Sequence, residues 1–338
     1  MFPDDVVLIT GFPSLLARTV CTEILESAPR ARIQAVMPAK FASEADAFIA
    51  ALPADQRGRV NILEGDSAAI DFGLSGAEYN ALAHDITHIH HCAQVSNLAV
   101  DLKGAERVNV GGAHEAIEMA TRCQKLEGLV FHSGACVSGD RTGLVREDEL
   151  KAGQSFRNVV EQTKARAESL MRGAMGRLPI TVVRPATIVG DSRTGEVDRF
   201  DGPYLLILLV VTSPPDIALP LPGRGDAPLN LVPIDWVAQA SVALGRDRAA
   251  RGRTFHLVDP APLTTRRVFE LVARAGGRPG PRGSIPANVA RTLLRAPGIE
   301  RFAKSPRALL ETLTTAVTYD ASNATERFRA LGVAACPP

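Results

Sequence analysis

The stretch that decides the fold is Asp5-Val6-Val7-Leu8-Ile9-Thr10-Gly11-Phe12-Pro13-Ser14-Leu15-Leu16-Ala17. Residues 6–9 form an unbroken apolar run, which is typical of a parallel strand buried on both faces. After the turn at Thr10-Gly11, apolar residues recur at helical spacing, at Leu15, Leu16, Val20, Ile24 and Leu25. The stretch therefore predicts a strand, a tight turn and a helix, and the N-terminus of such a helix suits a dinucleotide pyrophosphate.

The glycine pattern of this turn is incomplete. A full version would carry glycine at positions 11, 14 and 17, whereas this chain has Gly11, Ser14 and Ala17. Ala17 still allows close packing of the helix on the strand, and Ser14 narrows the approach to the phosphates but can donate a hydrogen bond. On this motif alone, the first strand and helix of any α/β protein stays open as an alternative.

The composition excludes several classes of protein. A chain of 338 residues with 46% apolar residues suits one large domain, or a large domain with a smaller lobe. A net charge of +1 gives no indication of nucleic acid or of an anionic membrane surface. The five cysteines lack paired or metal-ligand spacing, and no signal peptide is recognisable, which predicts reduced thiols in a cytoplasmic protein. The longest apolar run, residues 204–211, is too short to span a membrane.

Strand and helix signals alternate through the first half of the chain. Strands are expected at 33–37, 60–63, 86–92, 129–133 and 180–184, and helices at 42–52, 108–123 and 159–175. This rhythm predicts a parallel sheet with helices on both faces. After Pro185 it loosens, with helices expected at 203–212, 234–244, from Thr264 or Thr265 to 275, and at 286–295, 306–316 and 321–331, and a late strand at 254–258.

Seven short motifs follow one another in an order that is familiar from a known superfamily. They are Thr10-Gly11-Phe12-Pro13, Gly65-Asp66, His90-His91-Cys92-Ala93, Val108-Asn109-Val110, Glu161-Gln162-Thr163-Lys164, Val183-Arg184-Pro185 and Val232-Pro233-Ile234-Asp235. In these motifs, which cover roughly residues 5–260, the chain resembles the extended short-chain dehydrogenase/reductase superfamily. Within it, the chain resembles the thioester-reductase and fatty-acyl-CoA-reductase (male-sterility) branch.

The resemblance implies a Rossmann-like, doubly wound parallel sheet with a smaller, mostly helical C-terminal substrate lobe. Residues 1–190 and the late strand near 254–258 would form the dinucleotide-binding core. Residues 191–233 and 260–338 would form the substrate-binding lobe and the C-terminal helices. Within that lobe, Asp198, Arg199, Phe200, Tyr204 and the apolar residues 205–211 would face a greasy substrate. A dimer contact or a core helix is the alternative for the apolar run.

The resemblance also implies the cofactor contacts. Gly11 and the amides of Ser14 to Leu16 would hold the pyrophosphate, within a cofactor-binding turn that includes Thr10, Phe12, Pro13 and Leu15. Asp66 would meet the adenine edge, Ala93 would pass under the nicotinamide ribose, and Asn109 would brace the sheet beside it. Lys164 would bond the ribose hydroxyls, and Pro185 would contact the carboxamide. A turn aspartate for Asp66 and a polar residue at a helix start for Asn109 are the alternatives.

The end of the second expected strand indicates which dinucleotide is used. A reader of the ribose 2′-hydroxyl would be an Asp or Glu about 20 residues past the glycine turn. That place holds Val36-Met37-Pro38-Ala39-Lys40, which contains no acid, and Lys40 can pair with a 2′-phosphate. The sequence therefore favours NADP(H), with NAD(H) as the alternative and a solvated loop lysine as the other interpretation of Lys40.

The chain departs from the superfamily pattern at the proton-handling positions. The tyrosine expected four residues before Lys164 is Val160, and the Ser or Thr expected in the fifth-strand motif is Gly134, unless an alignment slip brings in Ser133. The candidate donors that remain are His132, Ser133, Cys136, Ser138 and Glu161, and Lys164, His132 and Ser133 are the catalytic candidates. A core or sheet-edge histidine is the alternative for His132. The cluster His88, His90 and His91 lacks acidic or cysteine partners at metal spacing, so no metal is expected.

These observations predict an NAD(P)-dependent oxidoreductase with a non-standard proton donor. Its substrate would be a small hydrophobic carbonyl, quinone-like or thioester-like compound, such as one of secondary metabolism, and the protein would be a monomer or homodimer. Two alternatives stay open. One is a catalytically silent NAD(P)-binding sensor or scaffold, and the other is a non-redox enzyme on the same fold.

Overall fold

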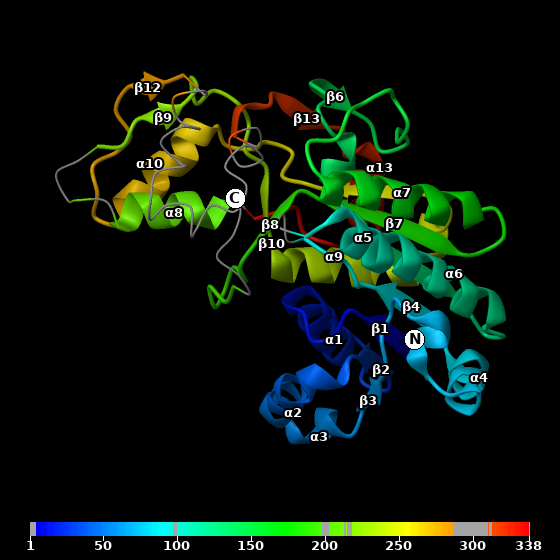
Figure 1. Cartoon of the computed structure of the whole chain (residues 1–338). Coiled ribbons are helices and arrows are strands. Elements are labelled where there is room, and N and C mark those ends of the chain that lie inside the picture. The colour runs from blue at the N-terminus through cyan, green and yellow to red at the C-terminus, as the bar shows by residue number, and fades with distance from the viewer. Residues whose placement is uncertain are drawn as a thin grey trace.

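A seven-stranded parallel sheet forms the centre of the molecule (Figure 1). The computed structural model describes residues 5–96, 100–197, 203–212, 214, 218–286, 289, 310 and 313–337. The strands are β1 (Val6–Thr10), β2 (Arg32–Met37), β3 (Val60–Glu64), β4 (His88–His91), β5 (Gly128–His132), β7 (Ile180–Pro185) and β11 (Thr254–Leu257), in the order β11-β7-β5-β4-β1-β2-β3. The strand order reverses between β1 and β4, which is the position where such sheets bind their ligands.

The apolar run that opens the chain explains why the sheet is covered on both faces. All of β1 is buried, and its side chains alternate between two cores. Val7 and Ile9 pack into the core under α1 (Leu15–Ser27) and α9 (Ile234–Arg246). Val6 and Leu8 pack into the opposite core, under α4 (Gly76–Asp85), α6 (Gly112–Arg122) and α7 (Val159–Ala174). The doubly wound parallel sheet predicted from the sequence is thereby confirmed.

The remaining elements are short. The helices are α2 (Ala42–Ala51), α3 (Ala54–Arg57), α5 (Leu102–Ala105), α8 (Pro203–Thr212), α10 (Thr265–Ala275) and α13 (Ser322–Leu331), with single turns η1 (Ala39–Phe41), η2 (Ile70–Gly73), η3 (Glu106–Gly111, of π type), η4 (Ala135–Ser138) and η5 (Arg248–Ala250). The strands outside the main sheet pair in parallel as β6 (Gly143–Val145) with β13 (Val317–Tyr319), β8 (Thr187–Val189) with β10 (Leu231–Pro233), and β9 (Leu221–Pro222) with β12 (Ser284–Ile285).

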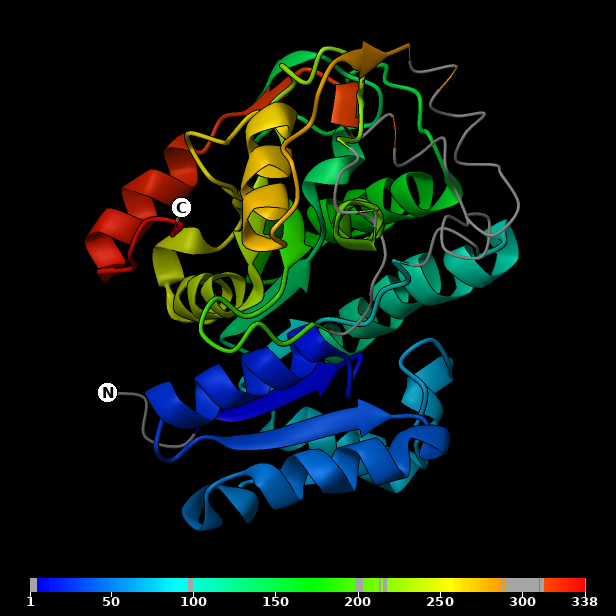
Figure 2. The same ribbon diagram turned by 90° about the vertical axis from the view of Figure 1, so that its left-hand side faces the viewer.

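A smaller lobe lies beside the sheet and contains α8, α10, β9 and β12 (Figures 1 and 2). Its own apolar cluster includes Val210 of α8, Leu221 of β9 and Phe269 of α10. Figure 2 shows that the strand arrowheads of the main sheet point to one edge, where the N-terminal end of α1 also lies. Among the described residues, no helix is both long and apolar enough to cross a membrane. Three residues expected to face the substrate, Asp198, Arg199 and Phe200, lie outside the described part.

Several expected elements differ in their limits. The helix expected at 108–123 begins earlier, because Asp101 caps α5 by accepting the Gly104 N–H at 2.9 Å, and the π turn then joins α5 to α6. The fourth strand is shorter than expected and pairs only at residues 88–91. Helix α4 was not predicted, although Ser75 and Glu78 form the capping box that announces it. The helices expected at 286–295 and 306–316 fall largely on residues that are not described.

The C-terminal segment is attached to the sheet by a buried carboxylate. Glu147 is only 2% exposed and accepts N–H groups from His256 of β11 and from Asn323 and Ala324 in the first turn of α13. These two helix N–H groups have no partner within α13, so Glu147 caps this helix from a distant part of the chain. Burial, helped by the nearby charge of Asp320, raises the pKa of Glu147 to about 7 although the three N–H groups favour its carboxylate.

The raised pKa of Glu147 predicts a pH-dependent contribution to stability. A glutamate titrates at about 4.3 in the unfolded chain. Between about pH 5 and pH 7.5 the folded state therefore binds more protons at this residue, and its contribution decreases as the pH rises. We expect the melting temperature of the wild type, minus that of Glu147→Gln, to fall steadily when measured from pH 5 to pH 8. A difference that stays constant over this range would contradict a raised pKa at Glu147.

Candidate active site

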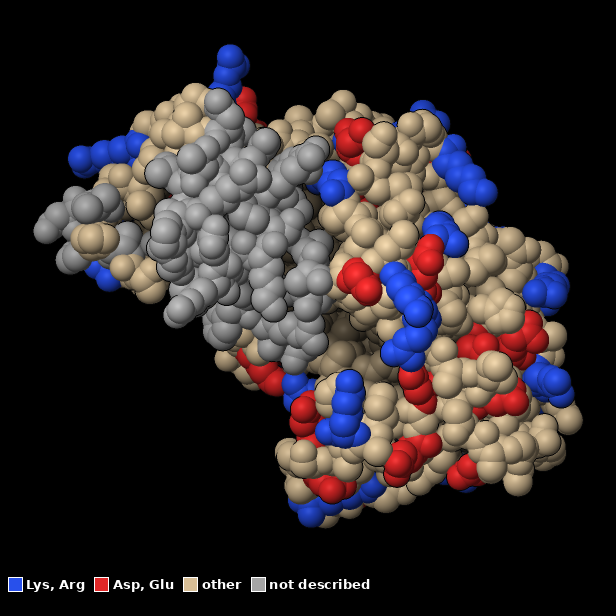
Figure 3. Space-filling view, viewed as in Figure 1, with Lys and Arg blue, Asp and Glu red and all other residues tan. Residues whose placement is uncertain are grey.

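The surface is hollowed at the edge of the sheet where the strands end (Figure 3). In this view the hollow lies above the tip of α1, and Lys, Arg, Asp and Glu side chains surround it. Because the strands of the main sheet are parallel, the turns that follow β1, β4, β5 and β7 all meet at this edge. Most of the residues singled out from the sequence belong to these turns, so the structure brings them to one side of the molecule.

The turn after β1 approaches the end of β4 very closely. Gly11 has a φ of 81°, and a Cβ atom at this position would lie 2.6 Å from the backbone N of Ala93. Only glycine fits both the backbone conformation and the space. Ser14 then caps α1, its Oγ accepting the Ala17 N–H at 3.4 Å. The N–H groups of Leu15 and the next residues have no acceptor inside the helix, so this turn fits a pyrophosphate.

Two polar side chains join the ends of β1 and β4 beneath this turn. Thr10 Oγ1 and His91 Nδ1 lie 2.9 Å apart, and the Ala93 N–H donates to the same hydroxyl at 3.4 Å. Burial lowers the pKa of His91 to about 4, so its ring is neutral at physiological pH. Phe12 is 2% exposed and its ring packs edge-on against Phe48. Thr10 and Phe12 thus position the turn from below.

The residues expected at the adenosine end gather beside β3. Asp66 accepts the Ala68 N–H at 3.0 Å with one carboxylate oxygen and pairs with Arg107 at 2.7 Å with the other. Partial burial opposes ionisation, but the Ala68 N–H and the Arg107 guanidinium outweigh it and hold the pKa of Asp66 below its usual value. Lys40, which is exposed in η1, adds to this effect. Arg107 was not singled out from the sequence, although it lies two positions before Asn109.

Asn109 connects the loop after β4 to the helix that carries Lys164. It lies in the π turn, where its Oδ1 accepts the Val95 N–H at 2.8 Å and its Nδ2 donates to Thr163 Oγ1 at 2.9 Å. Thr163 in turn donates to the Val159 carbonyl at 2.7 Å. Single π turns often mark functional sites. Here the turn places one amide so that it fixes α7 next to the end of β4.

Lys164, Gly134, Cys136 and Pro185 meet at the carboxyl end of β5. A Cβ atom on Gly134 would lie 3.3 Å from Cys136 Sγ, 3.7 Å from Lys164 Nζ and 3.9 Å from the Pro185 carbonyl oxygen. Within the part of the chain that is described, Lys164 donates no hydrogen bond to protein, so its ammonium is available to a ligand. Val160 lies one helical turn before Lys164 on the same side of α7 and is 5% exposed.

His132 and Ser133 each have a buried partner away from Lys164. The Ser133 hydroxyl donates to Glu168 at 2.6 Å, and Glu168 forms an ion pair with Arg184 at 2.5 Å. His132 Nε2 lies 3.3 Å from a ring nitrogen of His90, and burial, with a smaller effect of His91, lowers the pKa of His132 to about 3. Burial also raises the pKa of the Cys136 thiol, although the Lys164 ammonium opposes this rise.

All three tyrosines of the chain are described, and the phenol of one of them, Tyr319, contacts the loop that follows Gly134. Tyr79 of α4 packs beside Phe72, and the Tyr204 hydroxyl accepts the Gly190 N–H at 2.6 Å. The Tyr319 hydroxyl lies 3.3 Å from Ser138 Oγ and 3.4 Å from the Ala135 carbonyl oxygen. The pairing of β13 with β6 brings Tyr319 under the loop that follows Gly134, a contact that no sequence pattern announces.

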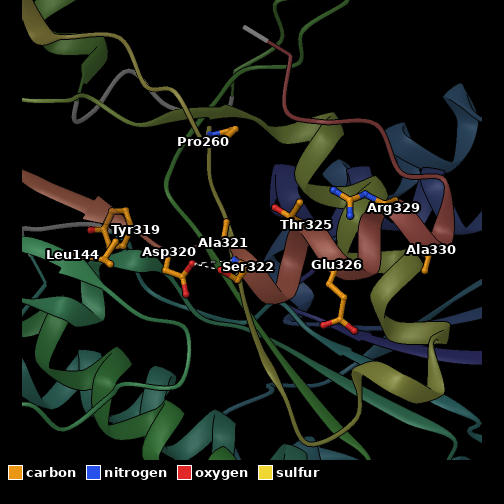
Figure 4. Close-up of a pocket in the computed structure, with 10 residues that line it drawn as sticks. All are labelled: Leu144, Pro260, Tyr319, Asp320, Ala321, Ser322, Thr325, Glu326, Arg329 and Ala330. Atoms are coloured by element: carbon orange, nitrogen blue, oxygen red, sulfur yellow. Dashed lines mark hydrogen bonds between the residues drawn. The ribbon is translucent and has the colours of Figure 1, made fainter.

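A second hollow, of about 730 Å³, lies on the outer side of Tyr319 (Figure 4). It is bounded by Leu144 of β6, by Pro260 and by one side of α13 up to Ala330. It contains none of the residues predicted to bind cofactor. Among the described residues, no three His, Cys, Asp or Glu side chains are placed to hold a metal ion.

The doubly wound sheet, the glycine turn at α1 and the lysine of α7 together define a reductase-type, NAD(P)-dependent fold of the extended short-chain dehydrogenase/reductase class. The chain belongs to the family described as "Male sterility protein", whose family model matches residues 9–241. This membership supports a nicotinamide cofactor.

Similar proteins include two curated reductases and one solved R domain. Glycine betaine reductase ATRR of Emericella nidulans is 30% identical over 223 residues, covering 64% of this chain and 17% of the relative. Fatty acyl-CoA reductase wat of Drosophila melanogaster is 23% identical over 289 residues, covering 73% of this chain and 55% of the relative. The terminal R domain of the myxalamid biosynthetic pathway has a TM-score of 0.82 at 25% identity, covering 99% of this chain and 87% of that one. The chain thus spans little more than half, or less, of these two curated relatives.

Proposed function

We propose that this protein reduces hydrophobic acyl thioesters with NADPH. In this proposal, residues 1–190 and β11 bind the dinucleotide, and residues 191–233 and 260–338 shape the acyl site. The observation that carries it is that Lys164 Nζ, the Pro185 carbonyl and Cys136 Sγ surround the Cβ position of Gly134, at the same sheet edge as the α1 N-terminus. The fatty acyl-CoA reductases among the relatives support the thioester substrate.

Each residue of the site has a role in this proposal. Gly11 and the first N–H groups of α1 hold the pyrophosphate, and the Pro185 carbonyl accepts from the carboxamide. Lys164 bonds the ribose hydroxyls and stabilises negative charge that develops on the substrate oxygen. The bound cofactor supplies a hydride. The apolar helix α8, whose Val210 is buried against the lobe core, suits a fatty acyl chain.

The test is reduction of octanoyl-N-acetylcysteamine by the purified protein. We expect NADPH oxidation at 340 nm that requires the thioester, with release of the free thiol. NADPH binding measured by calorimetry without any oxidation would instead favour a catalytically silent nucleotide-binding protein. The observation that favours this second function is that Gly134 and Val160 carry no hydroxyl groups.

We further infer that the cofactor is NADP(H), with Lys40 beside its 2′-phosphate. The end of β2 carries no acid, and Lys40 is exposed at the sheet edge near Asp66. We expect Lys40→Ala to raise the dissociation constant for NADPH about tenfold and to leave that for NADH unchanged, because one charge-assisted bond to phosphate is worth about 1.5 kcal/mol. Calorimetry with both cofactors measures this.

A matched control is Lys125→Ala. Lys125 pairs with Asp85 at 3.4 Å, before β5 begins and therefore at the opposite edge of the sheet. It should change neither dissociation constant. Tighter binding of NADH than of NADPH, unaffected by Lys40→Ala, would show that NAD(H) is the cofactor.

A further inference from the structure

We propose that this site reduces a thioester only as far as the aldehyde, because positions 134 and 160 carry no proton donor for a second reduction. The inference rests on the proposed function and concerns the product that leaves the enzyme. It makes Gly134 and Val160 determinants of product specificity. The two possible reduction steps differ in whether they need a proton from the protein.

The first step needs no proton from the protein. The acyl carbon of the thioester accepts a hydride with its electron pair, and the carbonyl oxygen becomes an oxyanion, which the Lys164 ammonium stabilises. The carbon–sulfur bond then breaks, the carbonyl reforms, and sulfur leaves with the bonding electrons as a thiolate. The thiolate takes its proton from water. The products are an aldehyde, a thiol and the oxidised dinucleotide.

The second step does need a proton. Hydride transfer to an aldehyde gives an alkoxide that has no leaving group to expel. An alkoxide is about as basic as hydroxide, the anion of water, which is itself a very weak acid. It must therefore be protonated as it forms, and a positioned general acid is worth about 10²–10⁴ in rate for such a step.

The described residues around the Cβ position of Gly134 offer poor donors for that step. Gly134 has no side chain, and Val160 is apolar and buried. The Ser133 hydroxyl donates to Glu168, and the Thr163 hydroxyl donates to the Val159 carbonyl. The Tyr319 phenol does reach the loop after Gly134, but its hydroxyl is engaged with Ser138 Oγ and the Ala135 carbonyl. A proton taken from Lys164 would remove the cation that, in the proposed role, holds the ribose and the oxyanion.

Among the described residues, Cys136 is the protic side chain that comes nearest to the Cβ position of Gly134. Its Sγ lies 3.3 Å from the place of a Cβ on residue 134, so it fills part of the space that a serine or threonine side chain would use. Burial raises the pKa of this thiol, which makes it a weaker acid than an ordinary cysteine. The experiment must therefore separate Cys136 from positions 134 and 160.

The experiment counts NADPH oxidised against thiol released from octanoyl-N-acetylcysteamine by the wild-type protein, with Ellman's reagent as the thiol probe. We expect a ratio of 1, accumulation of octanal, and reduction of added octanal at least 100-fold slower than that of the thioester. A ratio of 2 overturns this inference and leaves the proposed function intact. If that ratio drops to 1 in Cys136→Ala, the thiol is the donor. No NADPH oxidation, with or without thiol release, overturns both.

Restoring the two hydroxyls should change the product. Residue 134 has a φ of −174°, which any residue adopts, and a serine there requires Cys136 Sγ to give way by only a few tenths of an ångström. We expect Gly134→Ser combined with Val160→Tyr to raise octanal reduction at least tenfold and to move the ratio toward 2. The matched control combines Gly134→Ser with Val160→Phe, which has the same ring without the hydroxyl, and should stay at 1. Equal ratios in the two variants count against the inference.

A spectroscopic measurement tests the geometry without turnover. The phenol introduced by Val160→Tyr is titrated by its absorbance at 295 nm, with the wild type as the reference that contributes the other tyrosines. The titration is carried out once with Lys164 present and once with Lys164→Met. A neighbouring ammonium favours the phenolate, so we expect the phenol to titrate at lower pH when Lys164 is present. Equal titration in both backgrounds would show that residue 160 does not face Lys164, and the inference would fail.

Discussion

Ser14→Asp is expected to lower the affinity for NADPH at least 100-fold without lowering the melting temperature. Ser14 caps α1, and aspartate caps a helix as well as serine does. The new carboxylate would lie beside the first N–H groups of α1, where the pyrophosphate is proposed to bind. Two like charges about 4 Å apart near a protein surface repel by about 4 kcal/mol, which exceeds the 2.7 kcal/mol that a 100-fold loss requires.

The matched control for this experiment is Ser14→Asn. Asparagine has the shape of aspartate and also caps helices well, but it carries no charge. We expect it to bind NADPH within about fivefold of the wild type in calorimetry. If Ser14→Asp and Ser14→Asn bind equally well, the pyrophosphate does not lie at the α1 N-terminus.

Lys164→Met is expected to reduce kcat for the thioester about 10²–10³-fold, the usual cost of removing one donor to a developing oxyanion. Methionine keeps the unbranched, apolar part of the side chain, and α7 should keep its helix because methionine favours helices about as much as lysine. The affinity for NADPH should fall less than tenfold, because the pyrophosphate contacts remain. Stopped-flow measurement of NADPH oxidation separates the two effects.

Lys125→Met is the matched control, since it removes a lysine at the other edge of the sheet and should leave kcat unchanged. The fluorescence of bound NADPH shows whether each variant still binds the cofactor. A kcat for Lys164→Met within threefold of the wild type would mean that this ammonium does not contact the reacting carbonyl.

The sheet could be predicted from the sequence because each signal was local. The apolar run at residues 6–9 is buried on both faces, and a strand of that kind needs partners on either side. The lysine of α7 and the glycine of the β5 turn were also predicted to share a site. In the structure, a Cβ atom on Gly134 would lie 3.7 Å from Lys164 Nζ. The motif order that indicated the reductase family is matched by the family model over residues 9–241.

The contacts that hold the site together could not be predicted, because they join residues far apart in the chain. Nothing near Asp66 indicates that Arg107 pairs with it, and nothing near Ser133 indicates its bond to Glu168. Those pairings depend on the packing of η3, which carries Arg107, and of α7 against the sheet. Tyr319 is the clearest case, since it reaches the β5 loop only through the pairing of β13 with β6.

The contact between Tyr319 and the loop after β5 has a consequence for how the protein folds on the ribosome. Tyr319 follows Ala135, its partner, by 184 positions. At the usual rate of synthesis of about 5–20 residues per second, this tyrosine is made on the order of 10–40 s after the loop that it holds. The glycine turn after β1, in contrast, contacts the end of β4 at Ala93, which is made within the first hundred residues. A growing chain therefore contains both sides of the proposed pyrophosphate turn well before the residue that holds the loop at Gly134 is made.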